Sequence, residues 1–202
     1  MTCIVAGIDL FISRSLSRVI KNNLDQKSLR SLEKSLFFHH GMSIKLSVEH
    51  FDVLHGCLKD NSDFDLENFE KNCLKKIIDV TLSDNHFVVK ILDTDLSRII
   101  LNFYGDYESR CILQGIMGNS LTVPEILEKS DVLKSPAYRK IENLLLDGLI
   151  IESGKLFVNN KRVTKYTCIF DKIQIVIQGN DILIEGHVPS QIFNMSSIPK
   201  LI

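Results

Sequence analysis

The stretch Ser135–Ile150, SPAYRKIENLLLDGLI, combines basic and amide side chains with a helical repeat of apolar residues. On a helical wheel, at about 100° per residue, Arg139 and Asn143 point almost directly away from the apolar sector. Arginine and asparagine can each form two hydrogen bonds at once to the edges of guanine and adenine in the major groove. This face is therefore either a base-reading surface or a solvated helix face. The apolar sector holds Ala137, Ile141, Leu144, Leu145 and Gly148.

The ends of this helix carry their own signals. Ser135 is predicted to cap it, with Pro136 at the first helical position and Gly148 at the end. The hydroxyl of Ser135 and the free N–H groups of a helix start also suit a phosphate.

The elements around this helix follow a recognisable order. Short helices are predicted over residues 107–119 and from a Thr122 cap, with Pro124 in the first turn. Two strands, 149–158 and 161–170, follow the third helix and are joined through Asn159 and Asn160. Helix, helix, turn, helix and β-hairpin predict a winged helix-turn-helix over residues 106–170.

The charge of this region differs from that of the whole chain. The net charge is −1, yet seven bases and three acids lie between Lys134 and Lys165. Such an excess favours a polyanionic partner, and its modest size predicts that two copies bind together. The expected contacts to double-stranded DNA are Ser135, Tyr138, Arg139, Lys140, Asn143, Lys161, Arg162 and Lys165.

The first part of the chain is predicted to be helical. Apolar spacing indicates a helix over residues 8–23, and Asp25 and Gly41 cap and stop a second one. Ser47 is expected to cap the next helix, and residues 66–80 to form another. The second helix is expected to bury Leu29, Leu32, Leu36 and Phe37 on one face.

The remaining segments contain a connector and a second hairpin. A strand at 86–92 and a helix ending at Gly105 form the connector. In the hairpin, Gly179-Asn180 suits a type II′ turn, which sets Ile177 opposite Ile182 and Ile175 opposite Ile184. The fold class is therefore α+β and mainly α: a helical sensor or interaction domain, a connector, a winged helix-turn-helix and a C-terminal β-hairpin with tail. Their ranges are 1–83, 84–105, 106–170 and 171–202.

The sequence also predicts a homodimer, because one winged helix reads few base pairs. The interface is expected in the helical region before residue 105 or in the C-terminal hairpin. The connector helix carries more apolar surface than one core stripe needs, and the alternative is that its own chain wraps it.

Other residue types point away from catalysis and metal binding. The five cysteines are widely spaced without a C-x-x-C pair, so we expect most of them to be buried thiols. His39, His40, His50 and His55 lie with Cys57 in the segment 39–57. These histidines are expected at helix ends or on the surface, with a metal site in this segment as the alternative. No nucleotide-binding or hydrolase motif occurs, so we expect no enzyme and no cofactor. No apolar run reaches about 20 residues, and the start has no signal-peptide pattern, so we expect a cytoplasmic protein without a membrane segment.

Two parts of the chain carry a family resemblance. The stretch LTVPEILEKSDVLKSPAYRKIENLLLDGLIIESG, followed by KRVTKYTCIF, resembles the winged-helix regulators common in archaea, similar to the ArsR-like group. The stretch LRSLEKSLFFHHGMSIKLSVEHFDVLHGCLKD resembles a small helical domain of thaumarchaeal signalling and regulatory proteins. These resemblances imply a regulator whose N-terminal domain senses a signal, dimerises or contacts a protein or ligand. The paired cysteines of ArsR-type metal sensors are missing.

The leading hypothesis is a sequence-specific DNA-binding transcriptional regulator. The alternative is a winged-helix module that binds other proteins of a transcription or signalling complex, since the net charge is close to zero. A third possibility, a ligand or metal sensor that acts through the helical domain, is compatible with the hypothesis of a transcriptional regulator.

Overall fold

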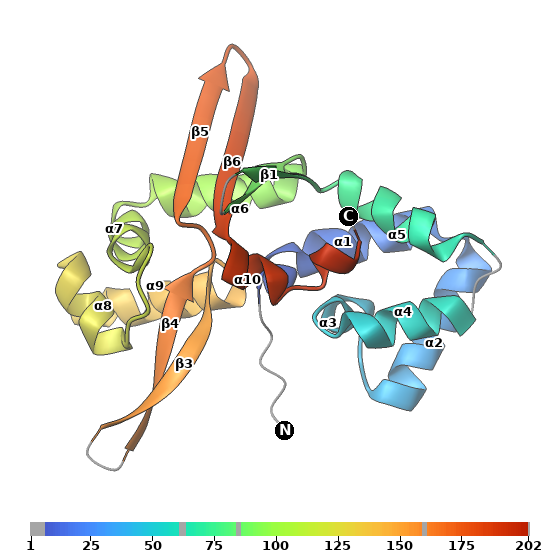
Figure 1. Ribbon diagram of the computed structural model, residues 1–202, viewed down its shortest axis with the longest axis horizontal. Helices are drawn as coiled ribbons and strands as arrows, with labels where there is room; N and C mark the ends of the chain where they lie inside the picture. The colour runs from blue at the N-terminus through green and yellow to red at the C-terminus, as the bar shows by residue number, and fades with distance from the viewer. Residues whose placement is uncertain (1–6, 61–63, 84–85, 159–160, 202) are drawn as a thin grey trace.

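The computed structural model describes residues 7–60, 64–83, 86–158 and 161–201. Figure 1 shows helices α2–α5 at one end and α7–α9 with the β3–β4 hairpin at the other. The β5–β6 hairpin projects between these two ends. The fold is mixed α and β, as predicted, and one continuous hydrophobic core links its parts.

The described residues form helices and antiparallel strands in a fixed order along the chain. The first part comprises α1 (Asp9–Asn23), α2 (Gln26–His40), α3 (Ile44–Val48), α4 (Phe51–Asp60), α5 (Leu66–Lys75), β1 (Ile78–Ser83), β2 (His86–Ile91) and α6 (Thr94–Gly105). The second part comprises α7 (Tyr107–Ile116), α8 (Val123–Ser130), α9 (Lys134–Leu146), β3 (Ile150–Val158), β4 (Lys161–Cys168), β5 (Lys172–Gln178), β6 (Asp181–Pro189), α10 (Ser190–Asn194) and a 3₁₀ turn (Ile198–Lys200).

Helix α2 begins and ends where its sequence predicts. The Asp25 carboxylate accepts hydrogen bonds from the N–H groups of Lys27 (2.8 Å) and Ser28 (3.0 Å). Gly41 ends the helix in the left-handed region at φ 64°, which glycine adopts without strain. The prediction for its apolar face was wrong at one position: Leu32 and Leu36 are fully buried, but Phe37 is 66% exposed.

The prediction that Ser47 caps a helix was wrong. Ser43 adopts the extended backbone of an N-cap and accepts a hydrogen bond from the N–H of Leu46 (3.2 Å), which starts the short helix α3. Ser47 lies inside that helix, where its buried hydroxyl donates to the carbonyl of Ile44 (2.9 Å). An earlier serine directly after the α2 stop therefore takes the capping role.

Helix α5 is shorter than predicted. It ends at Lys75, and the last residues of the predicted helix form strand β1 instead. Ile78 and Val80 pair with Ile91 and Val89 of β2. β-Branched residues pack well on a pleated sheet and lose side-chain freedom in a helix, so pairing with β2 outweighs the helical spacing.

The C-terminal hairpin completes a four-stranded sheet of order β1-β2-β6-β5. Val89 of β2 lies opposite Gly186 of β6. A Cβ atom on Gly186 would lie 2.3 Å from the ring of Phe170, so only glycine allows this close approach. Phe170 in turn meets Phe11 of α1 edge to face, with ring centroids 5.7 Å apart. The hairpin therefore packs against the first helix of its own chain.

The end of α9 also packs directly on α1. Gly148 has φ 72°, and a Cβ atom there would lie 2.5 Å from the backbone nitrogen of Phe11. Glycine is thus needed both for the backbone conformation and for the close contact. Helix α9 consequently has a fixed position relative to the N-terminal helices.

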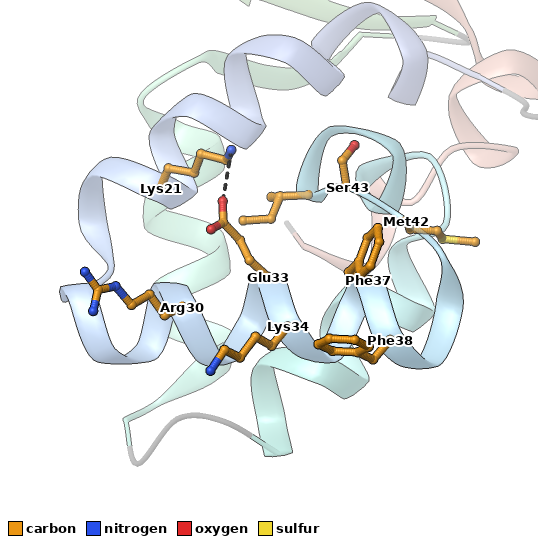
Figure 2. Close-up of a pocket in the computed structure, with 9 residues that line it drawn as sticks. Lys21, Arg30, Glu33, Lys34, Phe37, Phe38, Met42 and Ser43 are labelled. Atoms are coloured by element: carbon orange, nitrogen blue, oxygen red, sulfur yellow. Dashed lines mark ion pairs between the residues drawn. The ribbon is translucent and has the colours of Figure 1, made fainter.

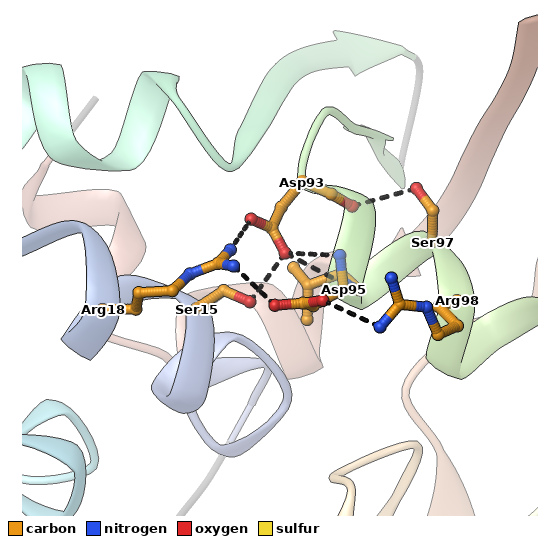
Figure 3. A network of polar contacts seen from close by, with 7 residues as sticks. Ser15, Arg18, Asp93, Asp95, Ser97 and Arg98 are labelled. Atoms are coloured by element: carbon orange, nitrogen blue, oxygen red, sulfur yellow. Dashed lines mark hydrogen bonds and ion pairs between the residues drawn. The ribbon is translucent and has the colours of Figure 1, made fainter.

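A polar network fixes α1 to the start of α6 (Figure 3). The carboxylate of Asp93 caps α6 by accepting from the N–H groups of Asp95 (3.0 Å) and Leu96 (3.1 Å). It also accepts from the hydroxyl of Ser15 (2.8 Å) and forms an ion pair with Arg18. Arg18 reaches Asp95 as well, at 2.6 Å. One buried carboxylate thus joins two helices and satisfies the start of the second.

The C-terminal tail returns to α1 through Asp9. The Asp9 carboxylate is 5% exposed and accepts hydrogen bonds from the N–H (2.9 Å) and the hydroxyl (3.0 Å) of Ser197. Phe193 of α10 stacks on Phe87 of β2 with ring centroids 3.9 Å apart. These contacts hold the C-terminal residues against α1 and strand β2.

Replacing Asp9 by asparagine is expected to remove a pH-dependent loss of stability. Burial raises the pKa of Asp9 from 3.8 to about 6, although the hydrogen bonds from Ser197 lower it. Below about pH 4 the folded and unfolded chains are both protonated at this group. Between about pH 4 and 6 the unfolded chain releases its proton first, so the free energy of unfolding falls and stays lower above this window.

The size of this effect follows from the shift. The pKa of Asp9 in the folded chain exceeds its ordinary value by about 2.2, which corresponds to about 3 kcal/mol in the free energy of unfolding. We expect asparagine to recover about 1–2 kcal/mol at neutral pH, because the amide weakens the bonds from Ser197. Urea denaturation across this pH range measures it. A variant that loses stability between pH 4 and 6 as steeply as the parent would assign the pH dependence to another group.

The turn of the β5–β6 hairpin has the predicted geometry and register. Gly179 has φ 61°, and Asn180 is not in the left-handed region, as a type II′ turn requires. Ile177 pairs with Ile182, and Ile175 with Ile184. The two pairs differ in burial: Ile184 is buried, while Ile177 is 70% and Ile182 43% exposed. The apolar stripe therefore runs out of the core along the projecting hairpin (Figure 1).

Candidate nucleic-acid interface

Helices α7 and α8 are joined by a segment that pairs with strand β4. Leu121 and Tyr166 exchange two backbone hydrogen bonds, of 2.9 and 2.7 Å, in an isolated antiparallel bridge. At the start of α8, Glu125 accepts from the N–H (2.7 Å) and hydroxyl (2.8 Å) of Thr122. Thr122 and Pro124 thus begin α8 as predicted.

Helix α9 begins two residues earlier than predicted. Lys134 is its first residue, and the flanking Leu133 makes no side-chain cap. The prediction that Ser135 caps the helix was wrong, because the extended backbone lies at Leu133 and Ser135 already belongs to the first turn. Pro136 is still accommodated, since N–H groups of the first turn have no partner within the helix. Ser135 and the uncapped N–H groups are exposed at this end of the helix.

The faces of α9 agree with the helical wheel. Ala137, Ile141 and Leu144 are buried against the core. Arg139 and Asn143 are exposed, one helical turn apart. The described residues provide no acidic side chain within ion-pair distance of Arg139. Its guanidinium is therefore available to an external partner.

Lys140 differs from the other basic residues of the predicted set. Its ammonium lies 2.7 Å from the carboxylate of Asp106 and 3.9 Å from that of Glu108. Asp106 also caps α7 by accepting from the N–H of Ser109 (2.9 Å). Hydrogen bonds from Lys140 and Ser109 lower the pKa of Asp106 to about 2. The charge of Lys140 thus serves to hold α9 against α7.

The β3–β4 hairpin carries the second group of predicted contacts. Lys161 and Arg162 are exposed and lie opposite Val158 and Phe157. Residues 159–160, predicted as its turn, lie outside the described residues. Lys165 is half-buried farther along β4. In the described part of the chain, none of these three bases forms an ion pair with an acidic side chain. Figure 1 shows this hairpin extending beside α8 and α9.

Three large apolar side chains on or directly before α9 and on β3 are exposed. They were not predicted as DNA contacts. They are Leu133 (79%), Leu146 (66%) and Phe157 (78%). Tyr138, a predicted contact, is 54% exposed. Glu142 is also exposed on α9, so the positive excess is moderate. The period-2 alternation of β3 was the only sequence signal that could have shown Phe157 on the outer face.

The histidines that were considered as metal ligands make local contacts within the protein. His39 and His40 end α2, where the sequence predicted helix-end histidines. His55 contacts the buried carboxylate of Glu70 at 3.0 Å beside a cavity of about 280 Å³. The described residues contain no group of three histidine, cysteine or acidic side chains that could hold a metal ion.

The cysteine prediction is confirmed for three positions. Cys57, Cys73 and Cys168 are buried thiols, and burial raises the pKa of Cys73 to about 11 and of Cys168 to about 12. Cys111 is a half-buried free thiol, and Cys3 lies outside the described residues. Over the described ranges, no helix combines the length and apolar character needed to cross a bilayer.

Comparison of the chain with protein-family models, with curated proteins and with solved structures gave no match. The side chains, contacts and charges described above are therefore the basis on which a function can be assigned.

Proposed function

We propose that this protein is a sequence-specific transcriptional regulator that binds double-stranded DNA through a winged helix-turn-helix formed by α7, α8, α9 and the β3–β4 hairpin. The proposal includes the resemblance to archaeal ArsR-like regulators and implies a cytoplasmic protein that acts as a homodimer. No cofactor, metal or catalytic step enters it.

The observation that carries the proposal is the pairing of exposed Arg139 and Asn143 on α9. Four residues of helix rise about 6 Å, close to the roughly 7 Å spanned by two base-pair steps. Both side chains can bind a base edge with two hydrogen bonds. The core face of α9 is fixed against α1 through Gly148, so the outer face is held rigidly.

The hairpin supplies the second element of the proposed interface. Two adjacent exposed cations, Lys161 and Arg162, are suited to phosphates beside the groove that α9 enters. Lys134 at the start of α9 and Lys165 on β4 add positive charge to the region formed by α9 and the β3–β4 hairpin. Lys140 is left out of the proposed phosphate contacts, because Asp106 already holds its ammonium.

Replacing Arg139 by alanine is expected to weaken specific DNA binding by about 1–3 kcal/mol and to relax preference at one base position. The reason is the loss of two hydrogen bonds to one base edge. Binding-site selection with parent and variant measures both effects. Arg98 is the matched control, since it is 71% exposed on α6 and remote from α9. Equal affinity of the Arg139 variant and the parent would remove Arg139 from the interface.

Replacing Lys161 and Arg162 together by glutamine is expected to weaken binding to every sequence alike. Each phosphate contact releases about one counterion, so the loss of two contacts per chain should lower the magnitude of the salt slope by roughly 2 per chain, or roughly 4 for the homodimer. Lys59 and Lys75, two exposed lysines of the N-terminal helices, form the matched double control. An unchanged slope in the hairpin variant would mean that the hairpin does not touch DNA.

A second candidate function is a module that binds another protein. The exposed Leu133, Leu146 and Phe157 favour it, because they lie on or directly before α9 and on β3, the elements of the proposed interface. Binding of a protein through these side chains would depend weakly on salt, whereas DNA binding weakens steeply with salt.

A further inference from the structure

A groove of about 490 Å³ lies on the N-terminal helices, on the far side of the molecule from the proposed DNA interface (Figures 1 and 2). Pockets for small molecules typically range over roughly 300–1,000 Å³. The groove is formed by the last turn of α1, most of α2 and the start of α3. Its lining consists of Lys21, Arg30, Glu33, Lys34, Phe37, Phe38, Met42, Ser43 and Ile44.

One end of the groove is apolar. Phe37 and Phe38 are 66% and 75% exposed, and their rings meet edge to face at 5.5 Å between centroids. Met42 and the buried Ile44 continue this surface at the start of α3. Two neighbouring phenylalanines in water are unfavourable, since burying one stabilises by about 1.5–3 kcal/mol. An apolar ligand segment would therefore gain free energy here.

The other end is cationic. Arg30 and Lys34 are exposed one helical turn apart, and the described residues place no acidic side chain within ion-pair distance of either. Lys21 is already paired with Glu33 at 3.2 Å (Figure 2). Three bases and one acid leave a local charge of 3 − 1 = +2. This end of the groove therefore favours an anion.

We propose that the groove binds a small amphipathic carboxylate with a medium-length aliphatic tail. Arg30 can hold the carboxylate with two parallel hydrogen bonds while Lys34 adds a second cation. The tail then lies along α2 over Phe37, Phe38 and Met42. The seven helical steps from Arg30 to Phe37 extend about 10 Å along the helix, which sets the length of ligand that satisfies both ends.

The test uses the full chain and two kinds of probe. 8-Anilinonaphthalene-1-sulfonate, an anion with an apolar ring system, is expected to bind saturably with one site per chain and a rise in fluorescence. Decanoate, below its micelle concentration, should displace it. Decylamine, which has the same tail and the opposite charge, and butyrate, which lacks the tail, should not. Displacement by decylamine as effective as that by decanoate would overturn the proposal.

Variants locate the site. Arg30→Gln combined with Lys34→Gln, and separately Phe38→Ala, should each weaken decanoate binding by about tenfold or more. The matched controls are Lys59→Gln with Lys75→Gln, and Phe157→Ala at an equally exposed phenylalanine. These side chains are all exposed, and circular dichroism is used to check that each variant is folded. An unchanged affinity for decanoate in both groove variants would contradict a carboxylate site. Binding of the protein to anionic vesicles only, at a level that added decanoate does not reduce, would contradict it as well.

Discussion

A lysine in place of Ile177 is expected to convert the proposed dimer of about 46 kDa, twice the 23.0 kDa chain, into a monomer. Strand β5 is the edge of the four-stranded sheet, and no described strand pairs with its outer side. Beyond Lys172 it carries no charged side chain, although charges are a common protection of sheet edges. The exposed Val176 and Ile177 make it a surface for a second copy.

Symmetry restricts how two β5 edges can pair. A two-fold axis perpendicular to the sheet requires that opposite residues face the same side, so their numbers must add to an even sum. Centring the axis on Ile175 sets Ile173 opposite Ile177 and keeps isoleucine against isoleucine across the interface. Lysine at 177 would then meet an isoleucine in an apolar contact.

The structure favours this hairpin over α6 as the interface. Leu96 and Ile100 of α6 are buried, and its other apolar side chains are packed against the core of their own chain. These partly buried residues are Ile99, Leu101, Phe103 and Tyr104. Helix α6 therefore offers less free apolar surface than the distal hairpin does.

Loss of the dimer should also lower DNA affinity by about a hundredfold or more, because the second winged helix no longer binds at high effective concentration. Sedimentation equilibrium at micromolar concentration measures the mass, and an operator titration measures the affinity. Thr81→Lys, the same change on the opposite edge strand β1, is the control. A parent protein that stays at 23.0 kDa, or an Ile177→Lys variant that stays dimeric, would contradict the β5 interface.

Removal of the Asp93 side chain is expected to destabilise the protein by about 2–5 kcal/mol. Asp93 is 7% exposed and combines the cap of α6, the ion pair with Arg18 and the bond from Ser15. In Asp93→Ala, the hydroxyl of Ser15, which is 2% exposed, loses its acceptor. A lost cap contributes about 0.5–2 kcal/mol, and an unsatisfied buried hydroxyl contributes about 1–3 kcal/mol.

The neighbouring acid Asp95 provides the matched control. It also pairs with Arg18, but its side chain is 37% exposed. Exposed ion pairs contribute up to about 1 kcal/mol, so Asp95→Ala should be mild. Urea denaturation of both variants compares the two free energies of unfolding. Similar losses in the two variants would show that the buried network does not hold α1 and α6 together.

Local signals in the sequence predicted the elements that depend on neighbouring residues. Asp25 and Gly41 define the ends of α2 because caps act within one helical turn. Gly179-Asn180 defines the hairpin register because the turn fixes which residues face each other. The outward direction of Arg139 followed from helical periodicity alone.

Features that depend on distant residues could not be predicted in this way. Residues 77–80 fit a helical pattern, and only pairing with β2 explains why β1 forms there. The ion pair between Lys140 and Asp106 joins residues 34 positions apart, so a helical wheel leaves that lysine free. Phe37 follows the spacing of the α2 core face but is 66% exposed, because the width of a buried helix face depends on the elements packed against it and not on spacing alone.

Salt-dependent binding to a selected operator tests the DNA-binding proposal most directly. Randomised double-stranded DNA is enriched with the purified protein, and the dissociation constant of the selected site is measured across a series of salt concentrations. With about six phosphates contacted by a dimer, the logarithm of the association constant should fall with a slope of about −5 against the logarithm of salt. Absence of any enriched sequence, or a slope near zero, would contradict the proposed function.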